Sequence, residues 1–348
     1  MSIQTDALIV GAGPVGLYQI FQLGLLEIKC HVVDALLHPG GQCIELYPDK
    51  PIYDIPGTPR TTGRELTASL MAQIKPFDTP FHMGQLVSQI EKLPDGQFQV
   101  ETSSGQQFKT KVIIIAAGVG AFQPKLLKID GVAKFANSQV FYHAQPPAIA
   151  GQHVLVIGGE DNALACAIDL ATMGAAKSVT LLHRRDVYQA APELISKLHE
   201  LHEAKALQLM VGQITGFDEE QGLMTATQVA GVDGDVRAVP VDKLLVYQGL
   251  SPKLGPIADW GLSMDRKQVA VDTEKFATSI PGIFAIGDIN TYPGKKKLIL
   301  SGFHECALAA FGAAEIVYPG KNPQLEYTTS SARLHRLLKV APATVFSG

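Results

Sequence analysis

The segment GAGPVG at residues 11–16 constrains the fold of this chain more strongly than its other features do. It follows a short apolar run at Asp6–Val10 and leads into an apolar stretch of helical length at Leu17–Leu26. A second apolar run, Lys29–Val33, ends at Asp34. A strand, a glycine turn, a helix, a strand and an acid in this order predict a βαβ unit that binds a dinucleotide.

Each residue type in this turn has a physical role. Gly11 permits the tight turn, Gly13 lets the backbone approach a pyrophosphate, and Gly16 allows close packing of helix and strand. Pro14 stands in the same turn, and the helix that follows offers free N–H groups and a partial positive charge to phosphates. Asp34 is placed to accept hydrogen bonds from ribose hydroxyls. The alternative is a glycine-rich turn in an ordinary βαβ unit.

A second copy of the pattern occupies the middle of the chain. The run Gln152–Ile157 predicts a strand, GGEDNA at residues 158–163 a turn, and Ala163–Met173 a helix. Ser178–Leu182 then predicts another strand, which ends at the segment His183–Arg185. The chain is therefore expected to contain two dinucleotide-binding units.

The second unit differs from the first in its charges. Arg184 and Arg185 stand where the first unit has an acid, and cations suit the 2′-phosphate of NADP. The first site therefore fits FAD or NAD and the second NADP, with Gly158 and Gly159 at the phosphates; a solvated surface face is the alternative for the arginines. Glu160 occupies the usual place of the second glycine, which predicts a modest affinity or a displaced pyrophosphate.

Composition excludes several other classes of protein. Hydrophobic residues make up 46% of the 348 residues and charged residues 18%, which supports large buried cores. The net charge of −4 argues against nucleic acid, and no apolar stretch is expected to reach the ~18–20 residues of a membrane helix. No leader sequence is indicated. The four cysteines are far apart in the sequence: Cys30, Cys43, Cys166 and Cys306. This spacing indicates neither a metal site nor a disulfide scaffold, and we therefore expect a reducing, cytoplasmic setting.

Two further strand–glycine segments indicate how the domains are connected. Val112–Ala116 runs into Gly118, and Gly282–Ile286 runs into Gly287 and Asp288. Both are interpreted as crossings between domains. We therefore expect an α/β fold in which one domain, residues 121–283, is inserted into a discontinuous domain, residues 1–120 plus 284–348.

This arrangement resembles the thioredoxin-reductase-like flavoproteins, and more closely the thioredoxin-reductase-like (type 2) ferredoxin–NADP⁺ reductases. The resemblance implies two Rossmann-like domains of the three-layer ββα/βα type, with the NADPH domain inserted into the FAD domain. It is carried over nearly the whole chain by GAGPVGLY, GGQCIELYPDKPIYDIPG, AAGVGAFQP, GIFAIGDINTYPGKKKLILSGFHE and LEYTTSSARLHRLL.

The resemblance also implies roles for individual residues around FAD. Asp34 would hold the adenosine ribose, Gln42 would hydrogen-bond the flavin, and Asp288 would bind the ribitol. Tyr47 would stack on one isoalloxazine face, with a core tyrosine as the alternative. Two more residues would contact FAD mainly through their backbones: Val87 and Phe122.

The C-terminal extension, residues 321–348, would cover the other face of the flavin in its own subunit or in a partner. Tyr327 would stack there, and Thr329 would hydrogen-bond the flavin from the same side. The run Leu334–Leu338 predicts a short amphipathic helix, which favours a docked tail over a loose arm.

The function that the resemblance implies is electron transfer between NADPH and ferredoxin through FAD in a cytoplasmic homodimer, with flavodoxin as an alternative partner. No protein acid or base is required, because the cofactor carries the chemistry. The chain has no CxxC, so electrons must leave the flavin directly, and the cysteines are interpreted as packing residues. The alternatives are a reductase of a disulfide or a small molecule, and a non-enzymatic NADPH or redox sensor.

An acidic ferredoxin would be helped to dock by a local basic patch. Lys295, Lys296 and Lys297 follow Asp288 closely, and the tail adds three more candidates: Arg333, Arg336 and Lys339. A solvated loop is the alternative for the lysines.

Overall fold

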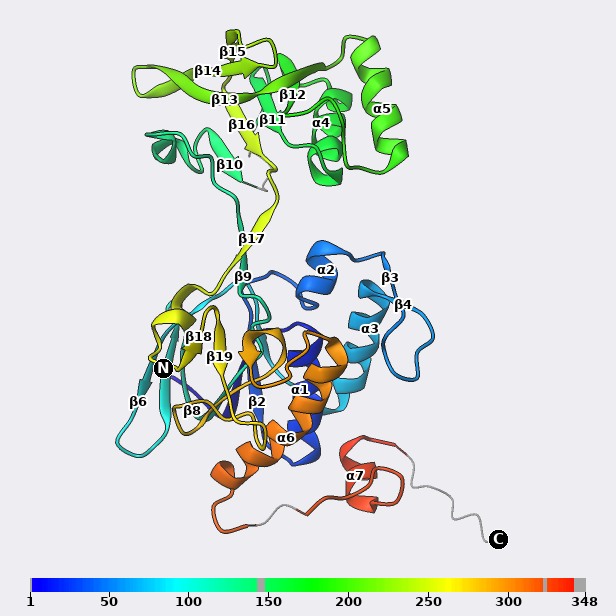
Figure 1. Cartoon of the computed structure of the whole chain (residues 1–348), viewed down its shortest axis with the longest axis vertical. Helices are drawn as coiled ribbons and strands as arrows, with labels where there is room; N and C mark the ends of the chain where they lie inside the picture. Colours follow the sequence, from blue (N-terminus) through cyan, green and yellow to red (C-terminus); the bar gives the residue numbers. More distant parts are fainter. Residues whose placement is uncertain (1, 143–147, 322–323, 341–348) are drawn as a thin grey trace. The chain divides into compact units, whose positions relative to one another are not determined.

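The computed structural model describes residues 2–142, 148–321 and 324–340, and the chain forms two compact units (Figure 1). The first unit comprises residues 1–122 and 252–348, and the second comprises residues 123–251. The chain passes between them through β9 (Ala121–Pro124) and β17 (Leu250–Lys253), which pair with each other. The predicted α/β fold with two Rossmann-like domains is confirmed.

The first unit is built on a seven-stranded sheet with the order β5-β2-β1-β8-β7-β6, to which β20 is added beside β8. The strands β5, β2, β1, β8 and β20 are parallel, whereas β8, β7 and β6 are antiparallel. Their bounds are β1 Ile3–Val10, β2 Cys30–Val33, β5 Phe81–His82, β6 Val87–Lys92, β7 Phe98–Thr102, β8 Gln107–Ile115 and β20 Ile283–Ala285.

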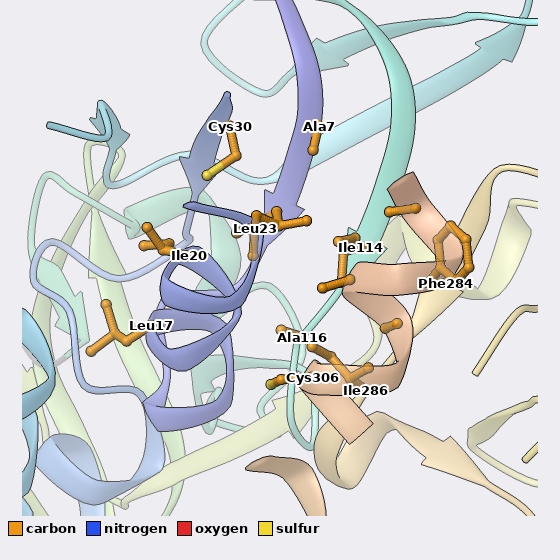
Figure 2. Packing of buried hydrophobic residues seen from close by; sticks show 14 of the residues in the cluster. Ala7, Leu17, Ile20, Leu23, Cys30, Ile114, Ala116, Phe284, Ile286 and Cys306 are labelled. Atoms are coloured by element: carbon orange, nitrogen blue, oxygen red, sulfur yellow. The ribbon is translucent and has the colours of Figure 1, made fainter. Parts of the chain in front are cut away.

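Helices α1 (Pro14–Leu25), α3 (Gly63–Ile74) and α6 (Ile299–Val317) contribute to the core of this unit. Figure 2 shows side chains of one buried cluster, with Leu17, Ile20 and Leu23 on α1, Ala7 on β1, Ile114 on β8 and Cys306 on α6. Apolar residues of α1, β1 and β8 are fully buried, and their removal from water stabilises this core.

Helix α6 corrects one expectation from the sequence. By length and composition it is a helix that could cross a membrane. In the structure it packs against α1, and its Glu305 is completely buried inside the protein. These contacts are those of a core helix.

The remaining elements of the first unit are short. Thr62 and Glu65 form a reciprocal capping box that begins α3. The elements are α2 Gln42–Leu46, β3 Pro51–Ile52, β4 Thr61–Thr62, η1 Lys75–Phe77, η3 Gly255–Asp259, β18 Met264–Asp265, β19 Gln268–Ala270, η4 Gly287–Ile289, β21 Asn290–Thr291 and α7 Ala332–Leu337.

The second unit has its own seven-stranded sheet, with the order β10-β16-β11-β12-β13-β14-β15. Its first five strands are parallel, and β13, β14 and β15 form an antiparallel extension. Its elements are η2 Val132–Phe135, β10 Val140–Tyr142, β11 His153–Ile157, α4 Asp161–Met173, β12 Ser178–His183, α5 Pro192–Glu203, β13 Gln208–Glu220, β14 Leu223–Gly231, β15 Val236–Pro240 and β16 Lys243–Val246.

The segment 252–283 packs with the first unit, although the sequence places it in the inserted domain. Trp260, Leu262 and Val269 are buried in the same cluster as Leu8 and Val10 of β1. These contacts are between residues far apart in the sequence, and such contacts are not visible in local patterns.

Two histidines on neighbouring strands form a close pair at the edge of the first sheet. Nδ1 of His31 on β2 lies 2.9 Å from Nε2 of His82 on β5, and their rings stack beside Phe108. Partial burial lowers the pKa of both rings, and the neighbouring imidazole lowers that of His31 further. The fold therefore favours the neutral pair.

We expect this pair to make the first unit less stable in acid. The unfolded chain takes up protons near pH 6.5, before the folded pair does, so stability is lost as the pH falls through that range. The double variant His31→Asn/His82→Asn should lose less of its urea midpoint between pH 7 and pH 5 than the wild type, as followed by far-UV circular dichroism. An equal loss in both proteins would contradict this origin of the pH dependence.

Candidate functional site

One cavity in the first unit opens at the carboxyl ends of the parallel strands β1, β2 and β8. Counted with its open mouth it encloses about 1150 Å³. This end of a parallel sheet is where α/β folds bind their ligands. The residues predicted from the sequence that line the cavity are Gly11, Gly13, Pro14, Asp34, Gln42, Tyr47, Val87 and Asp288.

The glycines of the first turn are required by their surroundings. Gly11 has φ of +113°, and a Cβ there would lie 2.3 Å from the carbonyl oxygen of Ala116. A Cβ on Gly16 would lie 2.0 Å from the carbonyl oxygen of Gly11. Both positions therefore exclude a side chain, which brings α1 close to the strand ends as predicted.

Gly13 is less closely enclosed than Gly11 and Gly16. The nearest atom to a Cβ there would be Cα of Gly41, at 3.9 Å. Gly13 is also the N-cap of α1, and the structure gives that end of the helix no side-chain cap in the part of the chain it describes. A helix start that lines the cavity with N–H groups fits the pyrophosphate of a dinucleotide.

Asp34 follows β2 directly and is tied to the glycine turn. Its Oδ2 accepts a hydrogen bond from the N–H of Ala12 at 2.5 Å, and its Oδ1 accepts one from Leu36 at 2.8 Å. Burial raises the pKa of the Asp34 carboxyl, and the two N–H donors oppose that rise. The carboxylate therefore lines the cavity in a fixed orientation, as a ligand for ribose hydroxyls requires.

The opposite side of the cavity is formed by α2 and the turn at η4. Gln42 Nε2 donates to Oδ2 of Asp288 at 3.2 Å. The hydroxyl of Tyr47 lies 3.6 Å from Sγ of Cys43. Burial and the neighbouring thiol raise the pKa of Tyr47, so this side chain presents a neutral ring to the cavity. The structure thus brings together Gln42, Tyr47 and Asp288, which the sequence separates by up to 246 positions.

The turn that carries Asp288 is held by one buried carboxylate, that of Glu305 on α6. Its Oε2 accepts hydrogen bonds from the N–H of Gly287 at 2.6 Å and from Nδ2 of Asn290 at 2.8 Å. Its Oε1 accepts from the hydroxyl of Tyr292 at 2.9 Å and from Nζ of Lys295. Burial and the Glu305 carboxylate raise the pKa of Tyr292 to about 12.

The buried ion pair corrects the interpretation of Lys295 as a docking residue. Its side chain is only 6% exposed, and that of Glu305 is fully buried. Lys296 and Lys297 are exposed, so these two remain available to a partner.

Glu305 was not among the predicted site residues. The available signal is a carboxylate within an otherwise apolar helical run, Ile299–Val317, close behind the Gly287–Asp288 pair. Gln268 was also missed; its Nε2 donates to the carbonyl oxygens of Asp288 at 3.3 Å and Asn290 at 2.6 Å. An isolated glutamine in a short strand gives no such signal.

The second unit repeats the glycine geometry at the end of β11. A Cβ on Gly158, where φ is +154°, would lie 2.5 Å from Cβ of Ala163 and from the carbonyl oxygen of Tyr247. A Cβ on Gly159 would lie 2.4 Å from the ring of His183. The two glycines thus permit close packing between the turn and its neighbours.

The charged residues at this turn and after β12 are exposed. Glu160 is the N-cap of α4, and Asp161 accepts a hydrogen bond from the N–H of Ala191 at 2.7 Å. Arg184 and Arg185 follow β12 and are both exposed. Their position after this strand is the one expected from the sequence.

Three further predicted residues lie in β9 and in the tail. Phe122 lies in β9. Tyr327 is 69% exposed, Thr329 is exposed, and neither lines the cavity. The tail is fastened to the C-terminal end of α1 by Arg333, which donates to Glu27 at 2.7 Å and to the carbonyl oxygen of Leu25.

The predicted short helix in the tail is confirmed as α7, which Ser331 caps. Two of the basic candidates for docking are engaged in ion pairs within the chain. Arg333 pairs with Glu27 and Glu326, and Lys339 pairs with Asp78.

All four cysteines are free and buried. Burial raises the pKa of Cys30 to about 12 and that of Cys306 well above its usual range. Burial also raises the pKa of Cys43, the cysteine that lines the cavity in the described part of the chain. These thiols are poor nucleophiles, because the thiolate is the reactive form.

Proteins of known family match this chain in sequence and in structure. Residues 5–302 match the family of pyridine nucleotide-disulphide oxidoreductases. Proteins named ferredoxin–NADP reductase are 62% identical in Polaromonas sp., over 97% of this chain and 93% of the relative, and 58% identical in Cupriavidus taiwanensis, over 97% and 91%. Among solved structures, thioredoxin reductase from Lactococcus lactis is 25% identical with a TM-score of 0.54, covering 90% of this chain and 99% of that one.

The fold has two units with a dinucleotide-binding turn in each, and the family model matches the chain over most of its length. Together these observations define the class of protein. The chain is a member of the pyridine nucleotide-disulphide oxidoreductases. Within that class it belongs to the thioredoxin-reductase-like ferredoxin–NADP reductases, which confirms the resemblance found in the sequence.

Proposed function

We propose that this chain is a ferredoxin–NADP reductase that binds FAD and transfers electrons between NADPH and ferredoxin. The observation that carries the proposal is a dinucleotide cavity with one buried cysteine, Cys43, and no second described cysteine beside it. A dithiol relay requires two neighbouring thiols. Electrons would therefore pass between the cofactor and an external carrier directly, which matches the name of the close relatives.

The residues of the first cavity would hold FAD. The turn from Gly11 to Gly16 would bind the pyrophosphate with Pro14 at the start of α1, and Asp34 would bind the adenosine ribose. Gln42 and Asp288 would hydrogen-bond the flavin and its ribitol. Further contacts would come from the ring of Tyr47, which would stack on the flavin, and from the backbones of Val87 and Phe122. When bound, FAD supplies the conversion between hydride transfer and single-electron transfer.

In the second unit, Gly158 and Gly159 would lie at the pyrophosphate of NADPH. Arg184 and Arg185 would pair with the 2′-phosphate, for which their exposure at a strand end leaves room. Glu160 stands beside the same turn, and its negative charge would weaken binding of the pyrophosphate. The proposed cofactor domains therefore correspond to the unit of residues 1–122 and 252–348 for FAD, and of residues 123–251 for NADPH.

The tail supports a homodimer. Its Arg333 binds the C-terminal end of α1, whereas the N-terminal end of α1 borders the cavity. The two ends of this twelve-residue helix are about 18 Å apart. Tyr327 and Thr329 are exposed and would be free to cover the cavity of a second copy. We place this homodimer in the cytoplasm, where NADPH and ferredoxin are both available.

The purified protein is expected to show flavin absorption and to reduce cytochrome c with NADPH only when ferredoxin is added. Cytochrome c serves as a one-electron acceptor, so its reduction reports electrons that have passed through ferredoxin. Reduction at the same rate without ferredoxin would favour a small-molecule reductase. A redox-active thiol pair found by titration would favour a disulfide reductase.

Replacing both arginines, Arg184→Ala/Arg185→Ala, should lower the preference for NADPH over NADH. Loss of charge-assisted hydrogen bonds worth about 1.5–3 kcal/mol corresponds to a roughly 10- to 100-fold fall in the ratio of kcat/KM values. The matched control is Lys177→Ala/Lys205→Ala, which removes two exposed cations from the same unit. An unchanged preference would refute the 2′-phosphate role.

Lys296→Glu should raise the KM for ferredoxin roughly threefold or more at low ionic strength, because a cation at the rim of an interface accelerates association with an acidic partner. Reduction of a small dye should be unaffected. Lys177→Glu, also exposed, makes the same change in net charge in the second unit and should leave the KM for ferredoxin unchanged. Equal effects on ferredoxin and dye would remove Lys296 from the docking surface.

A further inference from the structure

We propose that Glu305 is a positioning residue for the cofactor site: through Gly287 it orients Asp288 toward the cavity. This inference rests on the proposed function, because Asp288 is expected to bind the ribitol of FAD. Glu305 itself does not line the cavity. Its effect on the cofactor would therefore pass through the turn it holds.

The first argument is the origin of its hydrogen-bond donors. All four donors to the Glu305 carboxylate come from one stretch of nine residues, Gly287–Lys295. An ionised carboxylate accepts about four hydrogen bonds and donates none, so a single side chain can organise the whole stretch. Asp288 lies within that stretch, immediately after the Gly287 N–H that Glu305 binds.

The second argument is the arrangement of contacts on α6. Gly302, Glu305 and Cys306 are spaced three and four residues apart, so they share one face of the helix. A Cβ on Gly302 would lie 2.3 Å from Cγ2 of Val15, and Sγ of Cys306 donates to the carbonyl oxygen of Val15 at 3.2 Å. The same face of α6 thus contacts the first turn of α1 and the turn that carries Asp288.

The third argument is the number of independent restraints on Asp288. Glu305 holds the backbone before it, Gln268 holds its carbonyl oxygen, and Gln42 donates to its carboxylate. With the backbone held from the buried side, the side chain is directed to the cavity that it lines. A turn held by apolar packing alone would have no such directional restraint.

The fourth argument is the cost of the arrangement. Burying an ion pair such as Lys295–Glu305 requires both groups to leave water, and apolar residues of similar volume are often at least as stable. Global stability is therefore a weak reason for this pair. Lys295 balances the charge, and the carboxylate provides acceptors at fixed positions beside Asp288.

The test compares holoenzymes in which both charges are removed together, so that no unpaired charge is left buried. Lys295→Met/Glu305→Gln keeps a side-chain oxygen that can accept from Gly287, whereas Lys295→Met/Glu305→Leu keeps none. The rate of FAD release after dilution, followed by flavin fluorescence, should rise about tenfold in the leucine variant and less than threefold in the glutamine variant. The visible circular dichroism of bound FAD should change in the leucine variant alone.

Asp288→Asn provides the second arm of the experiment. It should accelerate FAD release on its own, but should add little in the Lys295→Met/Glu305→Leu background, because its orientation is already lost there. Fully multiplicative effects would overturn the proposal. Ala313→Gly is the matched control, since Ala313 is fully buried on α6 and is not part of this hydrogen-bond network. The same acceleration in Ala313→Gly would show a general loosening of α6 and would also overturn it.

Tyr292→Phe keeps the experiment decisive if the leucine variant does not fold. It removes one donor to Oε1 and leaves the ion pair intact, so FAD release should accelerate by about two- to threefold, again without a multiplicative effect of Asp288→Asn. No acceleration would contradict the proposal. A wild-type protein that holds no FAD would instead refute the proposed function, and the inference with it.

Discussion

The close approach of α1 to its neighbours is the constraint on which the first unit depends. At Gly11, Gly16 and Gly302 a Cβ would lie within 2.3 Å of an atom of Ala116, Gly11 or Val15, so the start of α1 is enclosed on several sides without room for side chains. Because protein interiors are close-packed, such contacts restrict the position of a helix. The same contacts bring the N-terminus of α1 to the strand ends, where the cavity opens.

Hydrogen bonds to two carboxylates orient the turns that packing alone does not hold in one orientation. Asp34 ties the glycine turn to the end of β2, and Glu305 ties the turn at Asp288 to α6. The Glu305 carboxylate is fully buried and that of Asp34 is half-buried, which is unfavourable unless their lone pairs are satisfied. Asp34 accepts hydrogen bonds from two backbone N–H groups, and Glu305 accepts one from Gly287 in addition to those from side chains. Asp34 and Glu305 thus orient the two turns that carry the proposed ligand-binding residues, while the apolar core stabilises the unit.

How far the sequence predicts this site depends on whether a residue acts within its own segment. Gly11, Gly13 and Asp34 belong to one βαβ unit, so their spacing along the chain already places them around one turn. Glu305 and Gln268 hydrogen-bond the turn at Asp288 from other elements, and Lys295 is buried in an ion pair with Glu305, ten positions away. Their roles therefore follow only from tertiary contacts. The packing of residues 252–283 with the first unit is invisible locally for the same reason, since Trp260, Leu262 and Val269 are buried there against β1.

The chemistry of the cysteines bears on how electrons can leave the site. Disulphide oxidoreductases need a thiolate, whereas burial keeps all four thiols of this chain protonated at neutral pH. Cys43 is the one at the cavity, and its neighbour there is the hydroxyl of Tyr47, not a second sulfur. An external one-electron carrier must then come close to the bound cofactor itself.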